Sequence, residues 1–189
     1  MDFNLTKEQK IIQKAAREFA KGEFTDVARD LDINETYPEK IVKKARELDL
    51  IGLFIPEAYG GPGLGYLEQA MVLEEFWKVD PGIGQQLSSV TFGAEEMLLF
   101  GTEEQKKKWL PPLFEGDAVM GFAITEPDAG SDLAGIRTAA VEEDEEIVID
   151  GSKTFISNGI NADLVVMAAR DPAIEDPYQA ISLYLVESG

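Results

Sequence analysis

Apolar residues recur at helical spacing in the first part of the chain. Between residues 6 and 22 they fall on one face, and Thr6 and Gln9 have the spacing of a capping box, in which each side chain bonds to the other residue's backbone amide. A second amphipathic segment follows Pro38 and ends near Leu50. We predict one helix in each of these segments.

Glycine and proline interrupt the helical pattern at residues 55–65, which read IPEAYGGPGLG. We predict a loop there, with positive φ angles at Gly60 and Gly61, because glycine adopts that conformation without steric cost. A helical pattern resumes at Leu67.

Further helical segments complete this part of the chain. Pro81 opens a stretch that runs to Phe100, and Thr102 then begins a second Thr-x-x-Gln capping box. We expect the helix after Thr102 to break at Pro111-Pro112, because proline has no amide hydrogen to donate.

From about residue 120 the pattern changes to short β-branched runs, at 147–149, 164–166 and 181–186. Asp150-Gly151 is a type I′ hairpin signal, and we predict that it joins two antiparallel strands, EEIVI and SKTFIS. The predicted fold class is therefore α+β, with an all-α helical bundle followed by an antiparallel β-domain.

The β-domain is expected to be incomplete. Three or so strands leave an open edge and little core, which is a weak design for an isolated unit. We predict a helical domain at residues 1–118 and a truncated β-domain at residues 119–189.

Composition excludes several functions. The chain carries 17 basic and 36 acidic residues, a net charge of −19 that repels nucleic acid. It has no Cys and no His, so a Ser-His triad, a cysteine nucleophile and an HExxH zinc site are impossible, and no metal site is expected. Any catalysis must use carboxylates, Lys, Tyr, hydroxyls or a bound cofactor.

No membrane span is expected, since a spanning helix needs about 18 uninterrupted apolar residues or more. The first twenty residues mix acidic and amide side chains through their apolar positions, unlike a secretory or transit peptide. We expect the protein to stay in the cytoplasm.

Two segments are candidates for chemistry. Residues 121–132, GFAITEPDAGSD, lead from an apolar strand into a tight turn whose amides and hydroxyls can contact a diphosphate or a flat heteroaromatic ring. Residues 151–159, GSKTFISNG, are predicted to place Phe155 and Ser157 on one face of a strand and Ile156 on the other. Taken alone, each segment is better explained as an ordinary structural element: a turn for residues 121–132 and a half-buried strand for residues 151–159.

Together, and after a helical domain, the two segments resemble the acyl-CoA dehydrogenase family. That family has a TEPxAGSD segment followed by a K-x-[aromatic]-I-[Thr/Ser]-N-G strand. IPEAYGGPGLG is similar to its I-P-E-x-Y-G-G-x-G loop, and FGTEEQKKKWLPPLFEG to its G-[ST]-x-x-Q-K-x-x-[YW]-L-P segment. The resemblance covers essentially all of the chain.

The resemblance implies that residues 119–189 begin a middle β-barrel domain that binds FAD. It places Thr125 near the isoalloxazine ring and Ser131 at the junction of the cofactor and the acyl-CoA substrate. The residues that it implies for FAD binding are Phe122, Ala123, Ile124, Thr125, Gly130, Ser131, Phe155, Ile156 and Ser157.

Three positions depart from the family pattern. Asp128 stands where many members have a small residue, Phe155 replaces the commoner Trp, and Ser157 replaces the commoner Thr. Phe keeps a flat face and Ser keeps a hydroxyl. The charge of Asp128 either points outward or weakens diphosphate binding, and both alternatives stay open at this point.

The family chemistry removes an α-proton from an acyl-CoA with a carboxylate and passes the β-hydride to the flavin, so the implied function is α,β-desaturation. The usual base is a Glu that would lie beyond Gly189, and no catalytic residue is assigned here. Surface solvation is the expected role of four other helical carboxylates: Glu74, Glu75, Glu95 and Glu96.

The resemblance also implies an electron-transfer flavoprotein as the electron acceptor and a homo-oligomer, a tetramer in the parent protein. Two alternatives stay open: an acyl-CoA oxidase, which passes its electrons to oxygen, and a non-catalytic dehydrogenase-like module that pairs with another chain. The missing base and the open sheet edge motivate the second.

Overall fold

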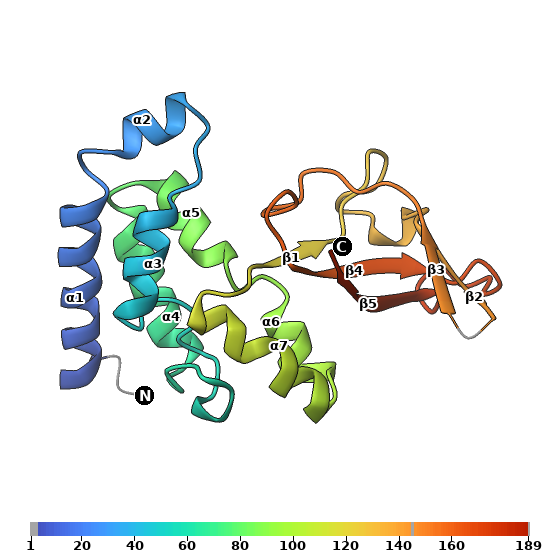
Figure 1. The fold of residues 1–189 in the computed structure, drawn as a ribbon, viewed down its shortest axis with the longest axis horizontal. Helices are drawn as coiled ribbons and strands as arrows, with labels where there is room; N and C mark the ends of the chain where they lie inside the picture. Colours follow the sequence, from blue (N-terminus) through green and yellow to red (C-terminus); the bar gives the residue numbers. More distant parts are fainter. Residues whose placement is uncertain (1–3, 145, 189) are drawn as a thin grey trace. The chain divides into compact units, whose positions relative to one another are not determined.

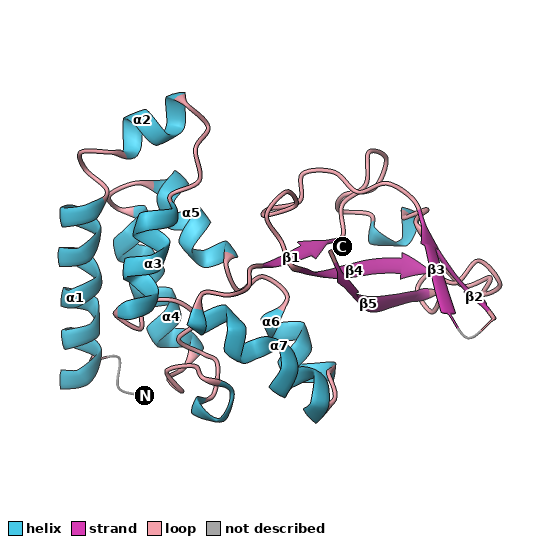
Figure 2. Ribbon diagram, viewed as in Figure 1, coloured by secondary structure: helices cyan, strands magenta, loops and turns pink. Residues whose placement is uncertain are grey.

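The computed structural model describes residues 4–144 and 146–188, and it divides the chain after Asp117 into two compact units (Figures 1 and 2). In the described residues no helix is both long and apolar enough to cross a membrane.

The first unit is helical, as predicted. Its elements are α1 (Lys7–Glu23), α2 (Ala28–Ile33), α3 (Glu39–Glu47), the 3₁₀ turn η1 (Glu57–Tyr59), α4 (Tyr66–Trp77), α5 (Pro81–Ser89), α6 (Ala94–Phe100) and α7 (Glu103–Glu115). Both predicted capping boxes are confirmed. The Gln9 amide donates to Oγ1 of Thr6 at 3.1 Å, and the Gln105 amide donates to Oγ1 of Thr102 at 3.2 Å.

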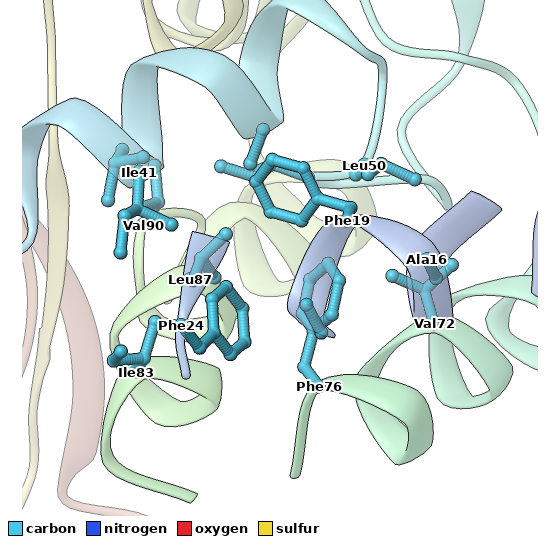
Figure 3. Close-up of a cluster of buried hydrophobic side chains, with 14 of the residues drawn as sticks. Ala16, Phe19, Phe24, Ile41, Leu50, Val72, Phe76, Ile83, Leu87 and Val90 are labelled. Atoms are coloured by element: carbon cyan, nitrogen blue, oxygen red, sulfur yellow. The ribbon is translucent and has the colours of Figure 1, made fainter. Parts of the chain in front are cut away.

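The core of this unit joins α1, α3, α4 and α5 (Figure 3). Phe19, Phe24 and Phe76 lie at its centre, with ring centroids 5.5–5.8 Å apart. Two of the three contacts are edge-to-face, the arrangement that aromatic rings favour. Full burial of each such side chain contributes about 1.5–3 kcal/mol. The amphipathic stripe of the first predicted helix is therefore its packing face.

Two details of the helical unit differ from the predictions. Helix α7 continues through Pro111 and Pro112, because Leu110 and Leu113 beside them are fully buried and hold this turn against the rest of the unit. Gly60 has the predicted positive φ of 86°, whereas Gly61 does not, and Gly63 takes the second one at 67°. Gly61 is required for another reason, since a Cβ there would collide with the Ile55 carbonyl.

The second unit is a five-stranded sheet made of β1 (Met120–Ala123), β2 (Ala139–Glu143), β3 (Glu146–Asp150), β4 (Leu164–Arg170) and β5 (Ile181–Glu187), with a 3₁₀ turn η2 (Leu133–Gly135). Strand β4 is central and largely buried. It pairs antiparallel with β5 and parallel with β1, with Met120 opposite Leu164. The α+β class is confirmed, but the sheet is mixed rather than antiparallel, because the long connection from β1 to β4 lets them run in the same direction.

The sheet contains a hairpin of β2 and β3, which lies earlier in the sequence than the hairpin predicted at Asp150-Gly151. Strand β3 pairs antiparallel with β2, which comes before it, and Ala139 lies opposite Asp150. Glu142 and Glu143 end β2, Glu146 begins β3, and Asp144 between the two strands has a φ of 49°. The predicted hairpin at Asp150-Gly151 is therefore wrong. Gly151 has no positive φ, and glycine is needed there because a Cβ would collide with Thr138.

Candidate functional site

The two segments singled out in the sequence lie side by side in the second unit. The Thr154 amide donates to the Thr125 carbonyl at 2.9 Å. Nδ2 of Asn158 donates to the Met120 carbonyl, also at 2.9 Å. The end of β1 and the chain after β3 are thus joined by direct hydrogen bonds, although about thirty residues separate them in the sequence.

A buried ion pair strengthens this junction. Nζ of Lys153 lies 2.9 Å from Oε1 of Glu126, and the two side chains are 7% and 6% exposed. Nζ also donates to the Ile124 carbonyl at 2.9 Å. The Glu126 carboxylate further accepts the amides of Arg137 at 2.7 Å and Thr138 at 2.9 Å. One carboxylate therefore joins three separate parts of the chain.

These interactions keep Glu126 ionised. Burial acts to raise the pKa of Glu126, but hydrogen bonds from Thr138, Lys153 and the neighbouring backbone outweigh it and lower the pKa to about 2. The sequence alone predicts no role for Glu126 or Lys153. Each of the two motifs contains one of these charged residues, but their pairing depends on a contact between distant segments that the sequence does not show.

The turn after Glu126 is closed by two backbone hydrogen bonds between Glu126 and Ala129, at 2.9 and 3.2 Å. Gly130 and Ser131 follow on the exposed side. The position of a Cβ on Gly130 is open, so a ligand can approach this backbone closely. Asp128 points outward, with 72% of its side chain exposed, and its Oδ2 lies 3.3 Å from Nη1 of Arg137. Of the two alternatives for Asp128, the structure favours the outward one.

Residues 151–159 do not form the predicted strand. Phe155 and Asn158 have φ angles of 57° and 62°, in the left-handed region that a strand cannot contain. The side chain of Phe155 is 92% exposed, and Ile156 and Ser157 are half-buried. The predicted alternation of Phe155 and Ser157 against Ile156 is therefore wrong, because hydrogen bonds to β1 and its following loop replace pairing within a sheet.

The remaining residues of the predicted site lie at the end of β1 and just after it. Ala123 is buried, whereas Phe122, Ile124 and Thr125 are half-buried. The contact between Thr125 and Thr154 brings this group next to Phe155, and Gly130 and Ser131 lie in the turn that follows. All nine predicted residues thus belong to two segments that the fold joins.

Several polar groups of these segments are available to a ligand. Within the described residues, the backbone amides of Thr125, Ser131, Phe155 and Ser157 donate no hydrogen bond. The hydroxyls of Thr125, Ser131 and Ser157 likewise have no hydrogen-bond partner there. Uncharged amides and hydroxyls of this kind suit the ring and the diphosphate of a dinucleotide cofactor, and an exposed aromatic side chain suits a flat ring system. The donor set fits such a ligand.

Comparison with known proteins agrees with this arrangement. The profile described as "Acyl-CoA dehydrogenase, N-terminal domain" matches residues 6–117, and that described as "Acyl-CoA dehydrogenase, middle domain" matches residues 121–189. The chain belongs to the acyl-CoA dehydrogenase family. Its two structural units coincide closely with the two matched regions.

Individual members of the family are similar over the whole chain. A short-chain specific acyl-CoA dehydrogenase of Clostridium acetobutylicum is 38% identical, and the match covers 100% of this chain and 50% of the relative. Butyryl-CoA dehydrogenase from Megasphaera elsdenii has a TM-score of 0.91 at 33% identity, over 100% of this chain and 50% of that structure. The FAD complex of PigA has a TM-score of 0.88 at 30% identity, with 100% and 50% covered. The chain thus spans about half the length of the relatives that it matches.

Proposed function

We propose that the protein containing these residues is an FAD-dependent acyl-CoA dehydrogenase, which introduces an α,β double bond into an acyl-CoA thioester. The observation that carries the proposal is the junction of residues 122–131 with residues 153–157, the two segments by which the sequence resembles this family. Their free amides and hydroxyls fit a flavin dinucleotide. The name of the PigA complex supports FAD as the particular flavin.

Within this proposal the nine residues named above line the FAD. Thr125 and the segment Phe155 to Ser157 bind and orient the isoalloxazine ring, and Ser131 lies between the cofactor and the acyl-CoA. When bound, FAD supplies the acceptor for the β-hydride of the substrate. The chain's own contribution is to position this acceptor against the thioester, since precise placement is a large part of catalysis in such reactions.

The carboxylate that removes the α-proton is proposed to lie outside these residues. Glu126 is unsuited to that task, because it is ionised with a pKa of about 2 and already accepts hydrogen bonds from three donors. A general base works best with a pKa near the working pH. Following the family resemblance, we propose that the base lies in a part of the protein beyond Gly189.

The wider assignments follow from the same proposal. Residues 1–118 form the helical domain, and residues 119–189 form the first part of a middle β-barrel. An electron-transfer flavoprotein accepts the electrons, the protein assembles as a homo-oligomer of the tetrameric type, and it works in the cytoplasm. Apolar side chains on the β2–β3 hairpin support a continuation of the β-domain, since Val141, Ile147 and Val148 are 40–56% exposed.

The test uses the protein purified in the length in which its source expresses it. We expect a yellow protein with bound FAD that bleaches without oxygen when a suitable acyl-CoA is added and reduces an artificial electron acceptor. Rapid formation of hydrogen peroxide in air would instead indicate an acyl-CoA oxidase. A pure protein of about 20.8 kDa that neither holds flavin nor desaturates any acyl-CoA would favour the non-catalytic module.

A further inference from the structure

The ion pair of Lys153 and Glu126 joins two segments and also contacts the backbone beside Thr125. Nζ of Lys153 lies 2.9 Å from both Oε1 of Glu126 and the carbonyl oxygen of Ile124, and its side chain is 7% exposed. A buried ammonium group needs such acceptors, because an unpaired charge in a protein interior is strongly unfavourable. The Ile124 carbonyl is therefore held toward Lys153.

This contact sets the direction of the Thr125 amide. The Ile124 carbonyl and the Thr125 N–H belong to the same peptide unit, and in a trans peptide these two groups point in opposite directions. The Thr125 N–H therefore points away from Lys153. The carbonyl of Thr125 is in turn bound by the Thr154 amide at 2.9 Å. The two peptide units on either side of Thr125 are thus both oriented by residues 153 and 154.

The same pair anchors the segment that carries Phe155. Lys153 and Thr154 are fixed to the end of β1, and Phe155 follows directly with a left-handed φ of 57°. Glu126 ties this arrangement to the chain before β2, through the amides of Arg137 and Thr138. The exposed aromatic side chain therefore projects from a backbone that is held on its N-terminal side.

We propose that Lys153 and Glu126 are positioning residues for FAD, which act by orienting the Thr125 amide and the Phe155 segment without touching the cofactor. This inference rests on the proposed function, because it requires that the protein binds FAD. It differs from a purely structural role, in which the pair would stabilise the second unit and leave the flavin environment unchanged.

The experiment compares Lys153→Met with the double variant Lys153→Met/Glu126→Gln in the protein as its source expresses it. Methionine keeps most of the side-chain volume but donates no hydrogen bond. The double variant also removes the charge that Lys153→Met leaves unpaired, so it separates the effect of that charge from the loss of the hydrogen bond to the Ile124 carbonyl. The dissociation constant of FAD, the flavin absorption spectrum and the thermal unfolding temperature are measured for both variants and the wild type.

We expect the dissociation constant of FAD to rise about tenfold to a hundredfold in both variants, because a Thr125 amide that is no longer oriented toward the cofactor is left without its hydrogen bond there. The flavin spectrum of both is expected to shift, even where the double variant regains thermal stability. The matched control is Lys78→Met, which removes an ammonium 3.1 Å from the buried Glu75 of the helical unit and is expected to change neither flavin property.

A double variant with wild-type FAD affinity and spectrum would overturn the positioning role and leave the pair as a structural element. The same holds if Lys153→Met alone binds FAD as the wild type does. A wild-type protein that holds no FAD would give a different result, because it would overturn the proposed function itself and this inference with it.

Discussion

Arg17 of α1 and Glu75 of α4 form a bidentate ion pair. Nε of Arg17 lies 2.8 Å from Oε2 of Glu75, and Nη2 lies 2.9 Å from Oε1. Glu75 is buried, and Nζ of Lys78 lies 3.1 Å from its Oε1. Hydrogen bonding from Arg17, aided by Lys78, lowers the pKa of Glu75 to about 2 against the effect of burial. The expectation of surface solvation is therefore wrong for Glu75, whereas its neighbour Glu74 is exposed.

Glu75→Gln is expected to destabilise the helical unit by roughly 2 kcal/mol. The neutral amide keeps the shape of the side chain but weakens its charge-assisted hydrogen bonds to Arg17 and Lys78. The measurement is chemical denaturation followed by the helical circular dichroism signal. Glu18→Gln is the control, because Glu18 forms an exposed pair with Lys14 at 3.6 Å and its replacement should have no measurable effect. Equal stability of the two variants would contradict a stabilising role for the buried pair.

Acid is expected to destabilise both units through Glu75 and Glu126. Each carboxyl has its pKa lowered from 4.5 to about 2 in the folded protein. The unfolded chain therefore binds protons at a higher pH than the folded one, and this stabilisation is complete above about pH 5 and is lost as the pH falls from 4.5 towards 2. The measurement is the unfolding free energy as a function of pH.

The single variants Glu75→Gln and Glu126→Gln test this assignment. Each should show a smaller loss of stability between pH 5 and pH 2 than the wild type, because one titrating group has been removed. A pH dependence identical to that of the wild type in both variants would show that other carboxyls cause the acid sensitivity.

Local sequence signals predicted the helices well because they act over a few residues. The Thr6 and Thr102 capping boxes have both partners within one turn, so their spacing determines their geometry. The predictions that were wrong depended on distant contacts. Pro111 stays helical because of packing at Leu110 and Leu113. Glycine is needed at residue 151 because Thr138, which directly precedes β2, leaves no room for a Cβ there.

The candidate site shows the same division. The fold joins the two segments that the motifs singled out, but the strand predicted for residues 151–159 is wrong. The hydrogen bonds that override this pattern are accepted by the carbonyls of Met120, Ile124 and Thr125, which lie 29 to 38 residues before their donors. The alternation of apolar and polar side chains does not indicate hydrogen bonds to such a distant segment. The charges of Glu126 and Lys153 do not indicate them either.

Gly151→Ala is expected to destabilise the β unit by about 1–3 kcal/mol, the usual cost of forcing extra volume into a packed site. The new methyl group would collide with the backbone and side chain of Thr138. Gly130→Ala is the matched control, because within the described residues no atom lies within 4 Å of its Cβ position and its φ is not positive. Thermal unfolding temperatures compare the two variants. The steric explanation fails if both variants melt together with the wild type.

Phe155→Ala is expected to weaken flavin binding while leaving the stability of the apoprotein unchanged. The side chain is 92% exposed, so its removal takes away almost no packing within the chain. If it lies against a flavin ring, its loss removes an aromatic contact of about 0.5–1.5 kcal/mol, a several-fold rise in the dissociation constant of FAD. Titration by flavin fluorescence measures that constant, and thermal unfolding of the apoprotein measures stability. Ile160→Ala is the control, because Ile160 is 99% exposed and has no part in the proposed site. An equal loss of FAD affinity in both variants would show that the affinity depends on exposed apolar area in general. It would contradict a specific contact between the flavin and an aromatic ring at residue 155.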